Sequence, residues 1–160
     1  MNTVNCPVCK TIELIKKNNN PYFLAELETG YVVTGDRQFF KGYTLFICRE
    51  HISELHFLES DFKIKFLNEL TLVSEAVYNC FKPLKLNYEL LGNVAPHIHW
   101  HIFPRYAEDP AVKDPVWFKN AEINKSDEFI PDETELKFIK ENLLCELQKI
   151  NGLNILKTYL

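Results

Sequence analysis

The sequence has few glycines and no long apolar segment. Only five of its 160 residues are glycine, so each glycine is expected to mark a turn. No apolar run approaches the roughly 18 to 20 residues that a membrane-spanning helix needs. Residues 1–3 lead directly into a polar segment rather than into a signal peptide. We therefore expect a soluble, cytoplasmic protein with no membrane partner.

Basic charge is not in excess either. Lysine and arginine number 18 against 22 aspartate and glutamate residues, a net charge of −4, which argues against a general nucleic-acid binder. The chain shows no internal repeat and no low-complexity linker, and 46% of its residues are hydrophobic. These features predict one domain over residues 1–160, with a core of about residues 5–106 and an extension over residues 107–160.

The cysteines are five, an odd number, and fall into two groups. Cys48, Cys80 and Cys145 are isolated among largely apolar residues and are expected to be buried, reduced thiols. Cys6 and Cys9 form a Cys-x-x-Cys pair, the spacing at which two thiolates bind one tetrahedral zinc ion. A thioredoxin-like redox pair would need a preceding strand, which the few residues before Cys6 cannot supply. Zinc is therefore favoured over redox chemistry, provided that the chain supplies two further ligands.

Three of the five histidines lie within residues 92–105. They are His97, His99 and His101, and each is followed by a hydrophobic residue. A period of two is the strand period, so the three imidazoles are expected to share one face while the hydrophobic residues face the core. Metal ligation, nucleophilic or acid–base chemistry at phosphate, and structural hydrogen bonding all suit such a cluster. We favour a chemical use, because clustered titratable groups are costly to keep without one.

The periodicity of the remaining chain predicts an α+β fold. A short helical turn is expected over residues 12–17. Strands are expected over residues 22–28 and 31–34, which Thr29-Gly30 joins as a hairpin, and over residues 43–49 and 85–91, followed by the histidine strand to about residue 103. A long helix with Ser60 as its N-cap should end before Pro83, with one apolar face packed on a sheet. Asp132 and Glu135 resemble a capping arrangement for a C-terminal helix. The predicted architecture is an antiparallel sheet of about five strands with the long helix packed on it and a C-terminal helical extension.

A second metal-binding residue type lies between the cysteine pair and the clustered histidines. His51 is on a predicted turn, so the chain can offer Cys6, Cys9, His51 and one of the clustered histidines as two thiolates and two imidazoles. A site with four protein ligands is closed, which makes the expected zinc structural rather than catalytic.

These features resemble the histidine triad, or HIT, family of nucleotide hydrolases and transferases, whose signature alternates histidine with hydrophobic residues as residues 97–103 do. The likeness extends through residues 42–45 and 49–55 and covers about residues 5–106. Residues 91–97 are similar to a bacterial-type branch close to diadenosine polyphosphate hydrolases. The resemblance implies the HIT fold and a homodimer.

The resemblance also implies roles for the histidines. The middle histidine of the family, here His99, attacks the α-phosphate of a nucleotide and is transiently nucleotidylated. A neutral imidazole can attack with one ring nitrogen while a backbone carbonyl holds the other. His101 would donate to phosphate oxygens or to the leaving group, and Asn93 would orient a non-bridging oxygen. In zinc-bearing relatives the first histidine completes the metal site, so His97 is the expected fourth ligand; without zinc it would support His99.

The sequence departs from the family pattern just before the triad. Many members have a longer glycine-rich loop with a glutamine or serine, whereas residues 92–96 are compact and Asn93 stands in for that residue. Asp36 is the nearest match to the side chain that holds ribose hydroxyls in the family, with an ordinary turn aspartate as the alternative. Arg105 is expected to meet a distal phosphate, with a surface arginine as the alternative.

The resemblance predicts a hydrolase of nucleotidyl phosphoanhydrides or phosphoramidates that releases a nucleoside monophosphate, with diadenosine polyphosphates as first substrates. One structural zinc ion per chain and no organic cofactor are expected. The alternatives are a nucleotidyltransferase using the same intermediate and a non-catalytic nucleotide-binding protein. Base preference, polyphosphate length and pathway stay open. Three roles are considered for residues 107–160: shaping the substrate groove through Trp117, assisting a dimer, or only covering the sheet.

Overall fold

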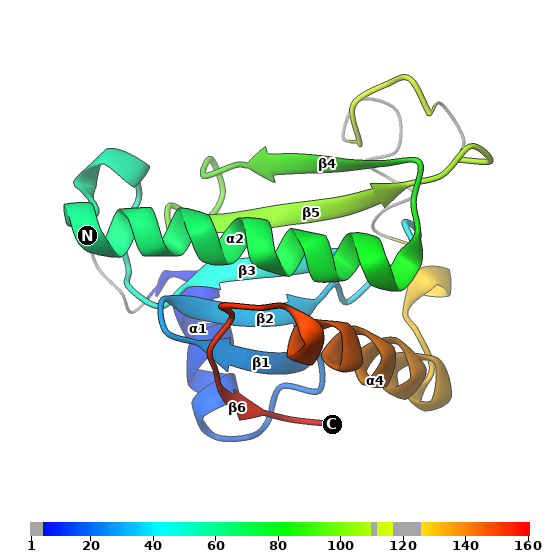
Figure 1. The fold of residues 1–160 in the computed structure, drawn as a ribbon, viewed down its shortest axis with the longest axis horizontal. Helices are drawn as coiled ribbons and strands as arrows, with labels where there is room; N and C mark the ends of the chain where they lie inside the picture. The colour runs from blue at the N-terminus through cyan, green and yellow to red at the C-terminus, as the bar shows by residue number, and fades with distance from the viewer. Residues whose placement is uncertain (1–4, 110–111, 117–125) are drawn as a thin grey trace.

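The computed structural model describes residues 5–109, 112–116 and 126–160. These residues form an antiparallel sheet of six strands in the order β4-β5-β3-β2-β1-β6 (Figure 1). The strands are β1 (Phe23–Leu27), β2 (Gly30–Thr34), β3 (Thr44–Cys48), β4 (Lys85–Leu90), β5 (His99–Arg105) and β6 (Ile155–Thr158). The α+β prediction is confirmed, including the hairpin that joins β1 to β2.

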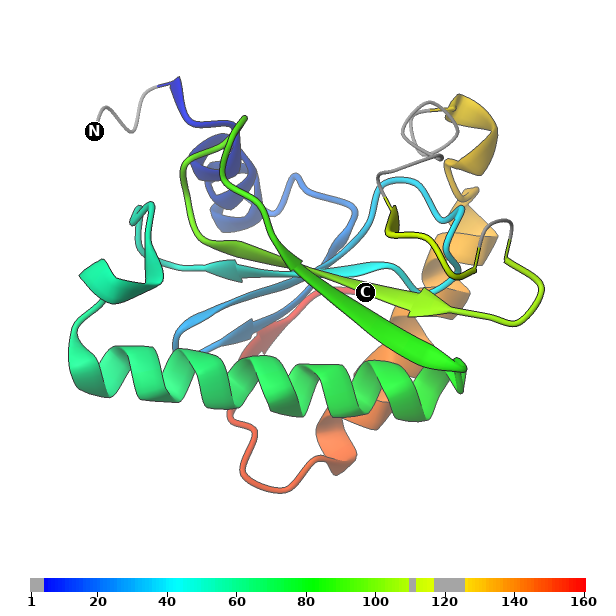
Figure 2. The ribbon, with the colours of Figure 1, turned by 90° about the horizontal axis from the view of Figure 1, so that it is seen from above.

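Helices cover both faces of the sheet. They are α1 (Pro7–Lys16), α2 (Ser60–Phe81) and α4 (Glu133–Lys149), with short 3₁₀ turns η2 (Leu55–Phe57) and η4 (Asp127–Phe129). Figure 2 shows α2 and α4 on one face and α1 on the other. The larger part of the core therefore lies between the sheet and the α2–α4 layer, whereas the α1 face carries a smaller apolar cluster and leaves room for a site.

The long helix α2 packs on the sheet through the predicted apolar stripe. Phe66, Leu70, Val73 and Val77 are all buried in the main core. The N-cap differs by one residue from the prediction, because Glu59 rather than Ser60 precedes the first helical residue and accepts a hydrogen bond from the Asp61 amide.

Strand β5 and the two residues before it have the two faces that the alternation in the sequence predicts. Ile98 and Ile102 are 2% and 0% exposed and belong to the core under α2. The neighbouring histidines lie on the opposite, α1 side of the sheet, where His97 meets the α1 cysteines and His99 lines a cavity beside α1. The regular strand starts at His99, and His97 lies in the irregular segment just before it.

Two predictions about local structure were incomplete. The sheet has six strands rather than about five, because Ile155–Thr158 adds β6 to the edge formed by β1. Helix α1 begins at Pro7, a favoured first helical residue, rather than near residue 12, so Cys6 is its N-cap residue and Cys9 lies in its first turn.

The expectation that the three isolated cysteines are buried holds fully for one of them. Cys48 is buried, but Cys80 is only partly buried and Cys145 is exposed on α4. The reason is that α4 turns only one stripe toward the core, and Leu143, Leu144 and Leu147 occupy it. All five cysteines lie in the described part of the chain and none forms a disulfide there.

Candidate functional site

Four predicted metal ligands converge from three separate segments. Cys6 and Cys9 come from the start of α1, His51 from the turn after β3, and His97 from the segment that enters β5. Their ligand atoms all lie within 4.8 Å of one another. The sequence reasoning had named these four residues, and the structure brings them together.

The distances within this cluster match a tetrahedral site. Cys9 Sγ lies 3.2 Å from His51 Nδ1 and 3.5 Å from His97 Nδ1, and the two Nδ1 atoms are 3.3 Å apart. Cys6 Sγ lies 3.9 Å from His97 Nδ1. Metal–ligand bonds of about 2.0–2.3 Å at tetrahedral angles separate ligand atoms by roughly 3.3–3.8 Å. The four residues therefore have the chemistry and the spacing to hold a metal ion.

A carbonyl orients the His97 ring for this use. Nε2 lies 2.8 Å from the Cys48 carbonyl oxygen, so it donates its proton there and Nδ1 keeps a lone pair toward the cluster. Burial lowers the pKa of His97, which also favours the neutral, ligating form. Burial and the neighbouring Cys6 raise the pKa of Cys9 to about 11 in the absence of a cation, and a bound metal ion would reverse that balance.

His99 is fixed in a similar way but faces a cavity. Its Nδ1 lies 2.6 Å from the His97 carbonyl oxygen, so Nδ1 donates and Nε2 is left unprotonated in the neutral ring. The side chain is 8% exposed and lines a cavity of about 380 Å³. The ring of His101 is next to it, with centroids 4.9 Å apart.

His101 is oriented by Tyr43, the residue immediately before β3. The Tyr43 hydroxyl lies 2.5 Å from His101 Nδ1, and its ring stacks on Phe103 at 4.2 Å. Burial lowers the pKa of His101 to about 4, with the neighbouring His99 adding to the effect, so the ring is neutral at pH 7. Burial raises the pKa of Tyr43 above its ordinary value, so the hydroxyl keeps its proton. Sequence reasoning gave Tyr43 no role, because its proximity to His101 depends on the pairing of β3 with β5.

The cavity beside His99 lies within the size range of small-molecule binding sites. Its floor is the sheet and its walls are α1 and three loops; the lining residues are Pro7, Val8, Thr11, Asn20, Tyr22, Val33, Thr34, Asp36, Leu45, Ile47, Ala95 and His99. Asp36, predicted to hold ribose hydroxyls, is therefore one of the residues that line this cavity. Asn20, Tyr22 and Thr34 were missed, since loop residues and the end of a strand carry no periodic signal.

Asp36 lies in a loop that is held by hydrogen bonds from one of its own side chains, Gln38. The Gln38 side chain is 8% exposed and bonds to the backbone of Gly35, Gly42 and Tyr43. Gly42 has a φ of +88°, and a Cβ there would lie 2.5 Å from the Phe81 ring, so only glycine fits. The loop that presents Asp36 is thus well defined.

Of the two further predicted substrate contacts, Arg105 has other surroundings than expected, whereas Asn93 lies on the predicted loop. Arg105 is 2% exposed, forms an ion pair with Asp109 at 3.0 Å and bonds to Asn87 and to the Asp114 carbonyl. This setting is a structural network, so we leave Arg105 out of the proposed site. Asn93 is exposed on the loop between β4 and β5, and the loop reaches the cavity through Ala95. Trp117, considered as a groove residue, lies outside the described residues.

Comparison with known proteins places the chain in a family. Residues 16–108, more than half of the chain, match the family model of the HIT domain. The chain belongs to the HIT domain family. Members of this family bind nucleotides, and many are hydrolases or transferases while some are not catalytic.

Individual HIT proteins agree with this assignment. The chain is 26% identical over 133 residues to "Protein hit" of Bacillus subtilis (strain 168), covering 78% of this chain and 86% of that protein. A histidine triad protein from Marinobacter aquaeolei VT8 shares 26% identity and a TM-score of 0.69, over 80% of this chain and 89% of that one.

A third relative is described as zinc-bound. This histidine triad family protein from Mycobacterium smegmatis is 17% identical with a TM-score of 0.63, over 94% of this chain and 99% of that one. At this identity the likeness concerns the fold. Among the helices of the described residues of our HIT protein, none has both the length and the apolarity to cross a bilayer.

Proposed function

We propose that this HIT protein hydrolyses nucleotidyl phosphoanhydrides or phosphoramidates through a covalent nucleotidyl intermediate on His99. The observation that carries the proposal is the position of His99 in the cavity wall with Nδ1 bonded to the His97 carbonyl. That bond leaves the Nε2 lone pair as the nucleophile.

The reaction has two displacements at the same phosphorus. His99 Nε2 attacks the α-phosphorus, a phosphorus–nitrogen bond forms, and the bond to the leaving phosphate or amine breaks with its electron pair on the leaving group. Water then attacks the nucleotidyl-histidine and releases one proton to solvent, the phosphorus–nitrogen bond breaks, and a nucleoside monophosphate leaves while His99 regains its lone pair. Each step is an in-line displacement that needs positioning more than further covalent chemistry.

His101 supplies a proton donor beside this phosphorus. The Tyr43 hydroxyl donates to Nδ1, so the neutral His101 ring carries its proton on Nε2. Nε2–H then donates to a phosphate oxygen or to the leaving group as negative charge develops. Asn93 orients a non-bridging oxygen from the loop before β5, and Asp36 accepts hydrogen bonds from the ribose hydroxyls at the cavity rim.

One structural zinc ion per chain fits Cys6, Cys9, His51 and His97. An ion there would join α1 to the segment before β5 and so would stabilise the folded arrangement of the chain. With four protein ligands, no coordination position is left for substrate. The zinc-bound relative from Mycobacterium smegmatis supports this assignment.

The experiment is mass spectrometry of wild type and His99→Ala after brief exposure to a diadenosine polyphosphate, with AMP release followed in parallel. Turnover in wild type alone, with a trapped nucleotidyl adduct, is expected. Addition of phosphate or a sugar phosphate distinguishes hydrolysis from nucleotidyl transfer, because only a transferase would form a new nucleotidyl product. AMP binding without turnover of any nucleotide in a panel, unchanged by His99→Ala, would instead identify a binding protein.

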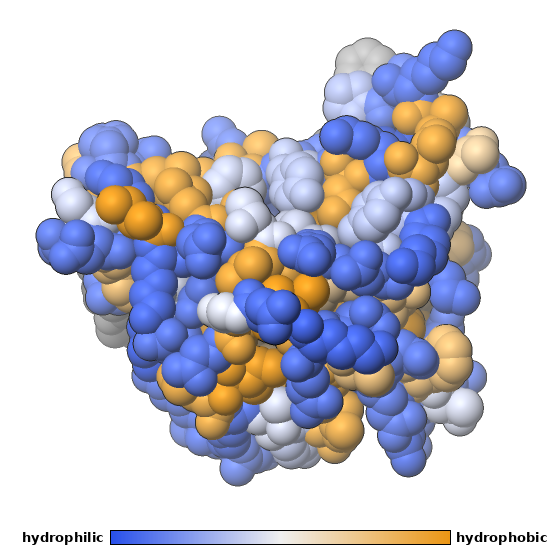
Figure 3. Space-filling view, in the orientation of Figure 1, coloured by the Kyte–Doolittle hydropathy of each residue, from blue (hydrophilic) through white to orange (hydrophobic). Residues whose placement is uncertain are grey.

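A homodimer through the α2–β4 side completes the proposal. β4 is an edge strand of the sheet, and a groove of about 690 Å³ lies between it and α2. Leu84, Tyr88 and Tyr78 line this groove and are 69%, 47% and 47% exposed. Figure 3 looks onto this face, where apolar atoms lie between β4 at the top and α2 across the middle. Exposed edges and apolar grooves of this kind are normally covered.

Sedimentation of two variants tests the dimer. Leu84→Glu places a charge in the groove and is expected to yield monomers, whereas Phe138→Glu, at an exposed apolar residue on α4, should leave the dimer intact. Wild type that sediments as a monomer at micromolar concentration would contradict the dimer.

A further inference from the structure

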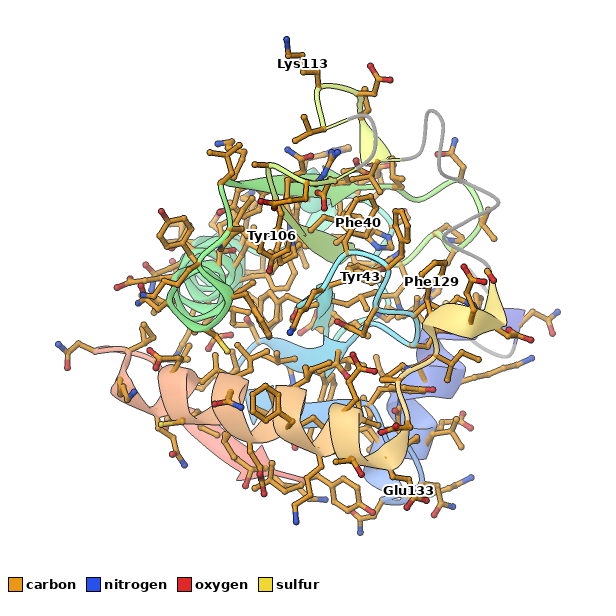
Figure 4. All side chains as sticks on the ribbon, turned by 90° about the vertical axis from the view of Figure 1, so that its right-hand side faces the viewer. Phe40, Tyr43, Tyr106, Lys113, Phe129 and Glu133 are labelled. Atoms are coloured by element: carbon orange, nitrogen blue, oxygen red, sulfur yellow. The ribbon has the colours of Figure 1, made fainter. Side chains whose placement is uncertain are left out.

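The C-terminal part of the chain contacts the loop that presents Asp36. Residues 126–130 lie outside the segment that matches the HIT domain. The backbone N–H of Gln38 donates to the Phe129 carbonyl at 2.8 Å. The rings of Phe39 and Phe129 meet edge to face, with their centroids 4.8 Å apart. Figure 4 shows Phe129, from η4, beside the loop that carries Phe40 and Tyr43. Residues 126–130 therefore hold this loop through contacts from another part of the chain, in addition to the hydrogen bonds that the Gln38 side chain makes within the loop.

An ion pair extends this contact to the cavity rim. Arg37 Nη1 lies 2.7 Å from Asp36 Oδ2, and Arg37 Nη2 lies 2.7 Å from Asp127 Oδ1. One guanidinium thus bridges two carboxylates, one in the cavity lining and one in η4. The Arg37 side chain is 27% exposed and that of Asp127 is 83% exposed, so the bridge is at the surface but its middle member is partly covered.

A second loop that lines the cavity is also held by the C-terminal region. Lys140 of α4 is buried, donates to the Pro21 carbonyl at 2.9 Å and lies over the Tyr159 ring. Pro21 lies between Asn20 and Tyr22, both of which line the cavity. Two loops of the cavity are therefore braced by residues that follow the HIT domain match.

We propose that Asp127 is a positioning residue for nucleoside binding, which acts through Arg37 to hold the Asp36 carboxylate toward the ribose hydroxyls. A carboxylate offers about four acceptor sites, and Arg37 occupies one on Oδ2, which leaves Oδ1 to the ligand. Without Asp127 the Arg37 fork has lost this anchor, and the Asp36 rotamer is less restricted before binding. The inference rests on the proposed function, because it assumes that the cavity takes a nucleoside.

The test measures binding of AMP and of 2′,3′-dideoxy-AMP to the full chain by calorimetry. Asp127→Asn is expected to weaken AMP binding about two- to five-fold, the range of an exposed charge pair. It should leave the dideoxy analogue unaffected, because that ligand has no hydroxyl for Asp36. Asp127→Glu, which keeps the charge, should restore most of the AMP affinity. Glu128→Gln is the matched control, an exposed neighbour in the same turn.

A double-mutant cycle separates positioning from general structure. If Asp127 acts through Asp36, Asp127→Asn adds no further loss of AMP affinity in an Asp36→Asn background. In turnover, Asp127→Asn should raise KM and leave kcat unchanged. The inference would be overturned if Asp127→Asn weakened the binding of AMP and of the dideoxy analogue equally, or if it bound AMP as tightly as the Glu128→Gln control does. In either case, turnover that depends on His99 would still uphold the proposed function. Wild type that neither binds AMP nor turns over any nucleotide would overturn both.

Discussion

At the scale of single residues, Tyr43 decides which nitrogen of His101 carries the proton. Tyr43→Phe keeps the ring that stacks on Phe103 and removes only the hydroxyl beside Nδ1. We expect kcat to fall about 5- to 10-fold with KM little changed, because one neutral hydrogen bond that sets the tautomer is lost. Steady-state kinetics with a dinucleotide substrate measure this. A kcat equal to that of wild type would show that Tyr43 does not orient His101.

His101 also makes stability depend on pH. Its pKa falls from 6.5 to about 4 on folding, chiefly through burial, so the unfolded chain binds more protons between those values. The stabilising contribution is complete above about pH 6.5 and is lost as the pH falls toward 4. Between pH 7 and pH 4.5 the loss should be about 2 kcal/mol.

Urea titrations of wild type and His101→Gln at pH 7 and pH 4.5 isolate this effect. The other acid-sensitive groups, the cysteine–histidine cluster included, are common to both proteins and cancel in the difference. The stability gap between the two proteins should shift by about 2 kcal/mol in favour of His101→Gln on acidification. A gap that does not change with pH would contradict the burial of an uncharged His101.

At the scale of elements, a buried carboxylate joins α2 to the β1–β2 hairpin. Glu69 is 3% exposed and accepts hydrogen bonds from the Glu28 and Thr29 amides and the Thr29 hydroxyl. Glu69→Gln places an NH₂ group among these donors, so we expect the free energy of unfolding to fall by about 2–3 kcal/mol. Asn68→Asp, exposed on the same helix and outside the α2–β4 groove, is the control in chemical denaturation. Equal stabilities for the two variants would show that the hairpin does not depend on Glu69.

At the scale of the whole molecule, the cysteine–histidine cluster connects the start of α1 to the turn after β3 and to the segment that enters β5. Purified protein should contain about one zinc ion per chain by elemental analysis. Cys6→Ser should lose the ion and about 4 kcal/mol or more of stability, because metal binding is coupled to the folded arrangement of its ligands. Cys145→Ser, at an exposed thiol, is the control.

The Cys6→Ser variant also tests whether the zinc ion has a structural or a catalytic role. Folded Cys6→Ser protein, assayed well below its unfolding temperature, should retain most of its kcat, because a closed four-ligand site does not contact substrate. Complete loss of turnover in protein that remains folded by circular dichroism would contradict a purely structural metal.

The sequence by itself determined the features that are written along the chain in a short period or spacing. The alternation at His97, His99 and His101 places one chemical face opposite one core face, because successive residues of an extended chain point to opposite sides. The spacing of Cys6 and Cys9 predicted a thiolate pair, and the three- and four-residue recurrence in α2 predicted its buried stripe. These signals need only local geometry, so they survive without knowledge of the fold.

Only the tertiary structure decided the contacts between distant residues. Tyr43 and His101 are 58 positions apart, and Arg37 and Asp127 are 90 apart, so neither pair leaves a local trace in the sequence. The burial of Arg105 and the addition of β6 to the sheet likewise depend on strand pairing across the chain. The candidate catalytic residues could therefore be named from the sequence, whereas the residues that hold them in place could not, because register and packing partners are set by the whole fold.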